Sequence, residues 1–222
     1  MSKQSKIKHI VKLVRASYQS VDKSMEGMKS HYGSPCTNGC DYCCYQLISS
    51  CIPECLVALY NIWNTPTLRD DFSSKLSRLS QEVGFLKKPY ASNQKWFDLN
   101  IPCVFLEDHK CSIYEDRPLA CRTQMSVEKT ADKCKNVGHA QKLKLVNHRP
   151  MMKDMLSLSL EFNRKFGISW GFRPLQQALL DAWDLYVTGP KHGNAKSNTD
   201  EIFAMSQWAR LELRHEDEED AW

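Results

Sequence analysis

This 222-residue chain lacks the long apolar segments that mark membrane and exported proteins. No stretch approaches the roughly 20 apolar residues of a membrane-spanning helix. The N-terminal segment MSKQSKIKHIVKLVRASYQ has several lysines but no apolar run of about seven residues, which argues against a secretory signal. We therefore expect a cytoplasmic protein without a membrane partner.

The common catalytic signatures are also missing. The chain has no phosphate-binding P-loop, no GxGxxG, no HExxH and no nucleophile elbow, so no catalytic residue can be assigned from a motif. It has no internal repeat and no low-complexity tract, and no rhythm of alternating strands and helices. These absences argue against repeat and α/β folds and leave open whether the protein is an enzyme.

Charge is moderate overall but uneven along the chain. The formal net charge is +4, and 42% hydrophobic with 25% charged residues is typical of a globular protein. Residues 1–31 carry seven lysines and arginines against two acids, whereas residues 201–222 carry two arginines against seven acids. We interpret both ends as solvated, and we do not expect nucleic-acid binding because no base-reading motif accompanies the basic segment. The sequence names no protein partner and no oligomeric state.

Apolar spacing predicts a mostly α protein. Residues 5–30 predict one amphipathic helix, since apolar side chains recur at steps of three and four. Pro53 and Glu54 predict a helix start. Further helices are expected over 68–86, 150–167, 174–188 and 200–214, a partly helical segment over 127–147, and loops over 87–101 and 191–199.

One small β element is expected between Pro102 and Tyr114. Two short strand-like runs flank the turn Glu107–Lys110, which is typical of a hairpin. The fold class is therefore a single mostly α domain with a small β-hairpin and a cysteine-lined metal or iron–sulfur centre. We divide it into an N-terminal amphipathic helix (1–33), a cysteine-cluster region (34–140) and a C-terminal helical extension with an acidic tail (141–222).

Ten cysteines are the most informative feature. Without an export signal they are expected to be reduced thiols, and clustered reduced thiols indicate metal chemistry. Four lie within nine residues around Gly39, which permits the sharp turn that brings thiolates to one point. Four more are spread between residues 103 and 134. The predicted metal ligands are Cys36, Cys40, Cys43, Cys44, Cys103, Cys111, Cys121 and Cys134.

The arrangement of these thiols leaves the number of centres open. Neighbouring side chains on extended backbone point apart, so Cys43 and Cys44 either include a spare thiol or serve different metals or different irons. Eight thiols suit two four-cysteine zinc sites, or one four-iron cluster with thiols left over. Cys121 follows a helix start predicted at Pro118, where the positive end of the helix dipole favours a thiolate.

Other candidate ligands are interpreted as structural. Cys51 and Cys55 flank a predicted helix start without a matching pair, so we interpret them as buried core thiols. His109 and His139 are substitute ligand candidates that we interpret as surface or structural residues. Arg117 and Arg122 flank Cys121, and their guanidinium groups are candidates to balance an anionic, thiolate-rich centre and so to assist cofactor binding.

These cysteine motifs, in this order, resemble the YkgJ-type cysteine-cluster family, a zinc- or iron-chelating domain named for its CxxCxxCC signature. Cys36-x3-Cys40-x2-Cys43-Cys44 resembles the signature loop, with one extra residue in the first spacing. Ile52-Pro53-Glu54 resembles the helix start that follows it. The string Cys111-Ser-Ile-Tyr-Glu-Asp-Arg-Pro-Leu-Ala-Cys121-Arg122 resembles the second block, and Cys134 falls at a further family cysteine. The resemblance covers about residues 34–140 and implies a zinc or iron–sulfur centre.

Three functions fit these features. The first is a metal-binding protein whose zinc or iron–sulfur centre has a structural or redox role. The second is a cluster-dependent enzyme, either an oxidoreductase or a methyltransferase using S-adenosylmethionine; some larger members of the family are protein lysine methylases. The spacing Cys36-x3-Cys40-x2-Cys43 also matches the loop of radical S-adenosylmethionine enzymes, without their strand–helix pattern. The third is a zinc-stabilised protein-interaction module, which a chelator would unfold.

Overall fold

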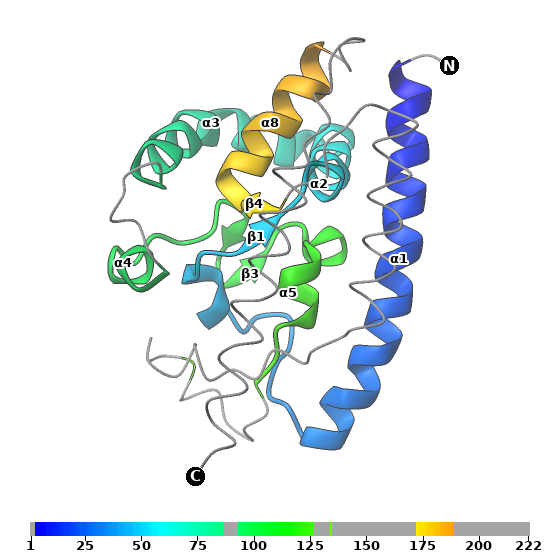
Figure 1. The fold of residues 1–222 in the computed structure, drawn as a ribbon, viewed down its shortest axis with the longest axis vertical. Helices are drawn as coiled ribbons and strands as arrows, with labels where there is room; N and C mark the ends of the chain where they lie inside the picture. The colour runs from blue at the N-terminus through cyan, green and yellow to red at the C-terminus, as the bar shows by residue number, and fades with distance from the viewer. Residues whose placement is uncertain (1–2, 87–92, 127–133, 135–171, 189–222) are drawn as a thin grey trace, which may run out of the picture.

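The computed structural model describes residues 3–86, 93–126, 134 and 172–188. The fold is mostly helical, as expected, with two small antiparallel sheets (Figure 1). The predictions for residues 127–147, 150–167, 191–199 and 200–214, for His139 and for the acidic tail lie outside these described residues, and the domain boundaries stay a prediction. Among the helices that the structure describes, none is both long enough and apolar enough to cross a membrane.

The first predicted helix is confirmed as α1, Lys3–Tyr32, which lies along one edge of the molecule (Figure 1). Its apolar positions at steps of three and four, from Ile7 to Met25, are buried in the core. Gly33 ends it at a φ of +60°, a left-handed conformation that glycine adopts without steric cost. Ser34 N–H donates to the Lys29 carbonyl at 3.0 Å and so satisfies one carbonyl of the last turn.

Three further helices build the core against α1. They are α2 (Ile52–Asn64), which begins beside the predicted start at Pro53, and α3 (Pro66–Leu86) and α8 (Leu175–Thr188), which are close to their predicted ranges. The α2 helix lies between α1 and α8, and Leu56, Val57 and Leu59 are completely buried. Trp63 of α2 packs against Trp183 of α8 with ring centroids 5.2 Å apart. Because α2 is buried in the core, it fixes the position of the C-terminal end of the cysteine loop that precedes it.

The loop predicted over 87–101 is wrong for part of its length, because α4 spans Asn93–Asp98. Trp96 of this short helix is 1% exposed and contacts the Phe85 ring of α3, with centroids 6.1 Å apart. Burial of one large aromatic side chain thus stabilises a helical turn that has too few apolar positions to show a period.

The predicted hairpin is confirmed, with short strands. β2 (Leu106–Glu107) pairs antiparallel with β3 (Lys110–Cys111). Asp108 and His109 form the turn with φ values of +46° and +62°, the pairing of positive φ angles that matches the twist of a two-residue hairpin. A second sheet, which the sequence did not predict, pairs β1 (Ser49–Ser50) with β4 (Arg173–Pro174). It attaches the chain before α2 to the start of α8.

Candidate metal centre

The first cysteine loop is shaped by local backbone hydrogen bonds. Gly39 has a φ of +109°, and the Cys40 N–H donates to the Thr37 carbonyl at 3.1 Å. A short 3₁₀ helix, η1 (Tyr42–Tyr45), follows, and its first turn is closed by the Cys44 N–H donating to the Asp41 carbonyl at 2.8 Å. These successive turns place all four thiols of the loop on one concave surface.

The second cysteine block is attached directly to this loop. The Cys103 N–H donates to the Cys44 carbonyl at 2.7 Å, so two ligand candidates 59 residues apart in sequence share one backbone hydrogen bond. At the hairpin turn, His109 Nδ1 lies 2.7 Å from Asp41 Oδ2 of the first loop. From the other side, Lys75 of α3 pairs with Glu107 of the hairpin at 3.0 Å.

One cavity of about 100 Å³ collects most of the predicted ligands. Trp96, Phe105 and Ile113 contribute apolar walls, and His109 lies at the exposed hairpin turn. The thiols that line this cavity, which we call the thiol cavity, are Cys36, Cys40, Cys43, Cys44, Cys103, Cys111 and Cys121. Seven of the eight predicted ligands therefore face one space, although they come from three separate parts of the chain.

Cys134, the eighth predicted ligand, is buried beside the thiol cavity without lining it. Ser126 connects it to the loop: its N–H donates to Cys36 Sγ at 3.2 Å and its hydroxyl hydrogen-bonds with Cys134. Cys134 is also close enough to Cys36 and Cys43 to affect them electrostatically. It belongs to the Cys36 side of the cavity.

Cys51 and Cys55 differ from these eight. Both are completely buried at the start of α2, and neither lines the thiol cavity. Cys51 Sγ donates to Glu54 Oε2 at 3.3 Å, and Cys55 Sγ to Ser50 Oγ at 3.6 Å. Burial raises the pKa of both thiols, which keeps them neutral. Their environment agrees with the interpretation as core thiols.

Burial also governs the protonation of the cavity thiols. It raises the pKa of Cys103 to about 12 and raises the pKa values of Cys40, Cys111 and Cys121 above the ordinary thiol value. Cys43 is the exception: a hydrogen bond with the Cys44 thiol and the charge of Arg117 lower its pKa. Both effects favour the thiolate form of Cys43.

The donor set fits a thiophilic metal in its chemistry but does not form a closed coordination site. Soft thiolates suit zinc and iron–sulfur clusters. Among the residues that the structure describes, however, no group of three or more His, Cys, Asp or Glu side chains is arranged to hold a metal ion. Binding at this cavity therefore requires the thiols to lose protons and to draw closer together.

The two arginines proposed to assist the centre occupy different environments. Arg117 lies over the Tyr114 ring at 3.8 Å and donates to the Tyr114 carbonyl at 2.6 Å. Its charge adds to the Cys44 hydrogen bond in lowering the pKa of Cys43, and it opposes the rise that burial causes in the pKa of Cys111. Arg122 reaches the cavity wall, but its guanidinium bonds to Asp22 and to the carbonyls of Glu115 and Arg117. Arg117 therefore acts on the thiols directly, whereas Arg122 organises the backbone.

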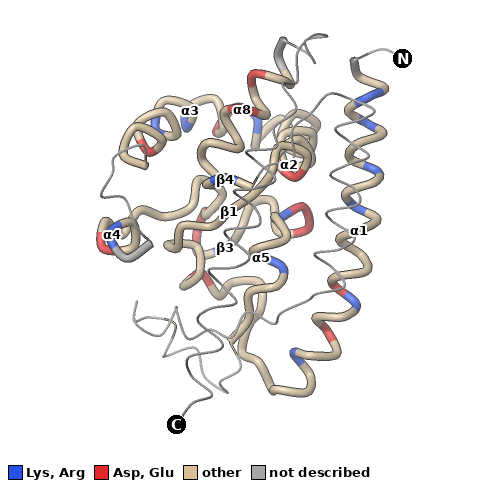
Figure 2. Tube along the Cα trace, in the orientation of Figure 1, with Lys and Arg blue, Asp and Glu red and all other residues tan. Residues whose placement is uncertain are grey.

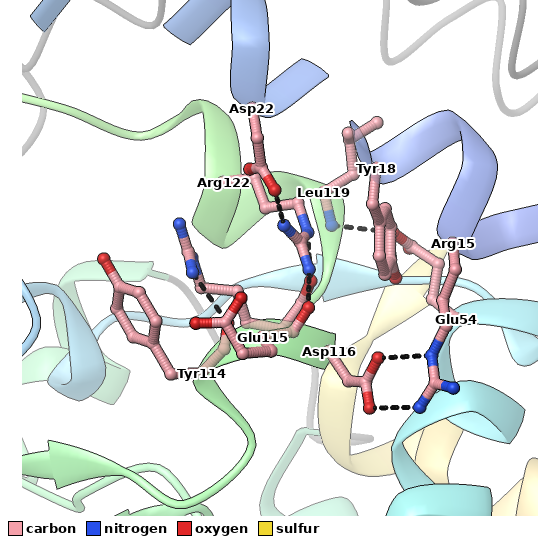
Figure 3. Close-up of polar contacts among 10 residues, drawn as sticks. Arg15, Tyr18, Asp22, Glu54, Tyr114, Glu115, Asp116, Leu119 and Arg122 are labelled. Atoms are coloured by element: carbon pink, nitrogen blue, oxygen red, sulfur yellow. Dashed lines mark hydrogen bonds and ion pairs between the residues drawn. The ribbon is translucent and has the colours of Figure 1, made fainter. Parts of the chain in front are cut away.

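Sequence reasoning missed a group of charged residues behind the thiol cavity, which we call the charged clamp (Figure 3). Its centre is Glu54, a carboxylate with 0% exposure that accepts hydrogen bonds from Tyr18, Ser50, Cys51 and the Leu119 N–H. Glu54 occupies the third position after the N-cap Cys51, a capping-box pattern that could have indicated a structural acid. The clamp comprises Arg15, Tyr18, Asp22, Glu54, Asp116 and Arg122.

The comparison with protein families agrees with this site. Residues 35–138 match the family model described as CxxCxxCC, putative zinc- or iron-chelating domain, which confirms the expected resemblance. This range contains all eight predicted ligands. No curated protein and no solved structure matches the chain.

Proposed function

We propose that this protein binds zinc or an iron–sulfur cluster through its cavity thiols, which is supported by the match of residues 35–138 to the CxxCxxCC family model. The centre then has a structural or redox role. The observation that carries the proposal is that seven of the eight predicted ligands line one cavity, whereas the two remaining cysteines of the chain are buried elsewhere.

The cavity supplies the three conditions that a thiolate centre needs. The candidate ligands are soft donors, the apolar walls exclude part of the solvent, and the Arg117 guanidinium places a positive charge near the thiols. Several buried thiolates without a metal would repel one another, which agrees with the raised pKa values of the neutral thiols. A bound metal cation would favour the thiolate form and replace the protons.

Zinc and an iron–sulfur cluster imply different roles for the same thiols. Zinc has no redox chemistry, so a zinc centre would contribute folding energy and hold the loop, hairpin and α5 (Leu119–Thr123) together. A cluster held by Cys thiolates would exchange electrons, with a potential set by nearby charge and hydrogen bonds such as those of Arg117. In the redox case the protein would serve an electron-transfer partner.

The proposal is tested on the whole 222-residue chain, purified without oxygen. Its visible absorption spectrum is recorded, and zinc, iron and acid-labile sulfide are quantified on the same sample. A brown protein with matching iron and sulfide would identify a cluster, and a colourless protein with stoichiometric zinc would identify a zinc centre. Absence of both metals, after anaerobic reconstitution with each, would contradict the proposal.

A matched pair of variants assigns the bound metal to the cavity. The double variant Cys43→Ser/Cys121→Ser removes two cavity thiols, and Cys51→Ala/Cys55→Ala removes the two core thiols. The first is expected to lose the metal and the second to retain it. Equal retention by both pairs would place the metal elsewhere.

A further inference from the structure

Helix α1 lies outside the matched range 35–138, yet its residues contact the second cysteine block at several points. Arg15, Tyr18 and Asp22 follow one another at steps of three and four, so they share one face of the helix. That face is directed toward η2 (Tyr114–Asp116) and α5 (Figure 3). The helix therefore touches the segment that carries Arg117 and Cys121.

Arg15 forms the first of these contacts. Its Nε donates to Asp116 Oδ1 at 2.8 Å and its Nη2 to Asp116 Oδ2 at 2.7 Å, a bidentate pair that fixes direction as well as distance. Asp116 is 4% exposed, so the carboxylate depends on Arg15 for its charge balance. This pair fixes the residue just before Arg117.

Asp22 forms the second contact, with Arg122. The Arg122 side chain is 1% exposed and its guanidinium lies over the Tyr18 ring at 3.9 Å. Besides Asp22, it donates to the Arg117 carbonyl at 2.9 Å and to the Glu115 carbonyl. One buried guanidinium thus binds α1 and also holds the backbone on the N-terminal side of Cys121.

Tyr18 completes the set through Glu54. Its hydroxyl donates to Glu54 Oε1 at 3.3 Å, and the same oxygen accepts the Leu119 N–H at 2.7 Å. Leu119 opens α5, two residues before Cys121. Backbone groups of residues 115, 117 and 119 are therefore all held by side chains that α1 contacts.

We propose that Arg15 and Asp22 are positioning residues for the thiol cavity: they hold the backbone that presents Arg117 and Cys121. The proposal rests on the proposed metal-binding function. Neither residue lines the cavity, so each acts through Asp116 or Arg122. Loss of either contact frees the η2–α5 backbone to move and lowers the retention of metal without removing a ligand.

The test uses the whole 222-residue chain, reduced and loaded with Zn²⁺, and measures the rate at which a chromogenic chelator removes the metal. Arg15→Ala and Asp22→Ala are compared with Lys12→Ala and Glu26→Ala, which remove exposed charges of the same signs from the same helix. Figure 2 shows basic and acidic residues along α1. Mutation of residues that hold metal ligands in place typically lowers metal affinity by about 10–100-fold. We therefore expect zinc release to accelerate about tenfold in Arg15→Ala and Asp22→Ala, and to stay unchanged in the two control variants.

Two further variants separate positioning from general destabilisation. Ile10→Val shortens a buried side chain of α1 that is outside the clamp, and is expected to lower the thermal midpoint without changing zinc release. Asp22→Glu retains the carboxylate and is expected to restore slow release. If an alanine variant fails to fold by circular dichroism, Arg15→Met and Asp22→Asn, which remove the charge and keep about the same side-chain length, replace it.

The outcomes distinguish the inference from the proposed function. Zinc binding by the wild type with equal release rates in all variants would overturn the positioning role alone. Faster release from Ile10→Val equal to that from Asp22→Ala would also overturn it, because the effect would then follow stability. Failure of the wild type to hold zinc or iron would contradict the proposed function itself.

Discussion

The segment from Cys111 to Arg122 has two sides, and they differ in how they satisfy charge. On one side, Cys111, Arg117 and Cys121 line the thiol cavity, where burial raises the pKa values of the two partly exposed thiols. On the other side, Asp116 and Arg122 are buried with complete ion pairs to α1. The fold thus pairs the charges on one side of the segment, and the other side carries the thiols that bind the proposed metal.

This contrast explains why one short string contains so many specific residues. Ile113 and Leu119 are buried in the hydrophobic core, Asp116 and Arg122 bind α1, and the two cysteines face the cavity. The residues between the cysteines of this motif therefore stabilise the fold, and only part of the motif serves the candidate metal site. Substitutions on its two sides should have separable effects on metal binding and on stability.

The largest predicted difference is between a cavity cysteine and a core cysteine. Cys121→Ala removes a predicted ligand, so it should weaken metal binding by more than about 100-fold. That value is the upper end of the effect expected from mutating a residue that only supports a ligand. Cys55→Ala should retain the metal and lower the free energy of unfolding by about 1 kcal/mol. Metal content after dialysis and urea unfolding of both variants measure the two effects. Similar metal loss in both would contradict the division between cavity and core.

The next effect concerns the clamp side. Arg122→Met removes a buried guanidinium and leaves Asp22 and two backbone carbonyls without their donor. Breaking a buried pair from one side typically costs about 3–5 kcal/mol; because Asp22 is 37% exposed, we expect about 3 kcal/mol. Chemical unfolding of the metal-free, reduced protein gives the value. A loss below about 1 kcal/mol would show that Arg122 does not anchor the fold.

The neighbouring arginine sharpens the comparison from the cavity side. Arg117→Gln should weaken metal binding by about tenfold, since it removes the positive charge that favours the thiolate forms of Cys43 and Cys111. The unfolding free energy of the metal-free protein should change by less than about 1 kcal/mol, because the Arg117 side chain is only partly buried. Competition with a zinc chelator measures the affinity. A stability loss equal to that of Arg122→Met, with unchanged affinity, would reverse the two roles.

The smallest predicted effect is on the pH dependence of stability. Burial raises the pKa of Glu54 above its ordinary value of 4.5, although the hydrogen bonds from Leu119, Cys51 and Ser50 oppose the shift. The folded state therefore binds the Glu54 proton more tightly than the unfolded state. Stability from this group is present below pH 4.5 and is lost as the pH rises through the raised pKa.

Glu54→Gln should remove this contribution. Unfolding free energies of wild type and variant, measured from pH 4 to 8 on metal-free protein, should show a flatter curve for the variant. A parallel pair of curves would mean that the Glu54 pKa is the same in the folded and unfolded states.

The sequence predicted the helices that bury one continuous apolar face. In α1 the buried apolar positions recur from Ile7 to Met25, over about five turns. In α8 the buried residues Leu175, Leu179 and Ala182 recur over about two turns. The helix α4 and the β1–β4 pair were missed for a common reason. Each is very short, and each depends on a distant contact, Trp96 with Phe85 or Ser49 with Pro174, that local periodicity does not contain.

The sequence predicted the cysteines of the candidate site but did not predict the charged clamp behind it. Dense cysteines around Gly39 pointed to the first loop, and the family resemblance pointed to the second block; seven of these eight thiols line the cavity, and their role as metal ligands stays a prediction. The clamp was not visible, because Arg15 and Asp116 are 101 residues apart and Asp22 and Arg122 are 100 residues apart. Single charged residues in an amphipathic helix look like a solvated surface until the tertiary fold pairs them.

The central claim is that a metal is held by the cavity thiols, and X-ray absorption at the edge of the bound metal tests it most directly. For zinc we predict a coordination shell of four sulfurs at about 2.3 Å. For an iron–sulfur cluster we predict sulfur neighbours with a second shell of iron. A first shell dominated by nitrogen or oxygen, or one that is unchanged in Cys43→Ser/Cys121→Ser, would contradict the account.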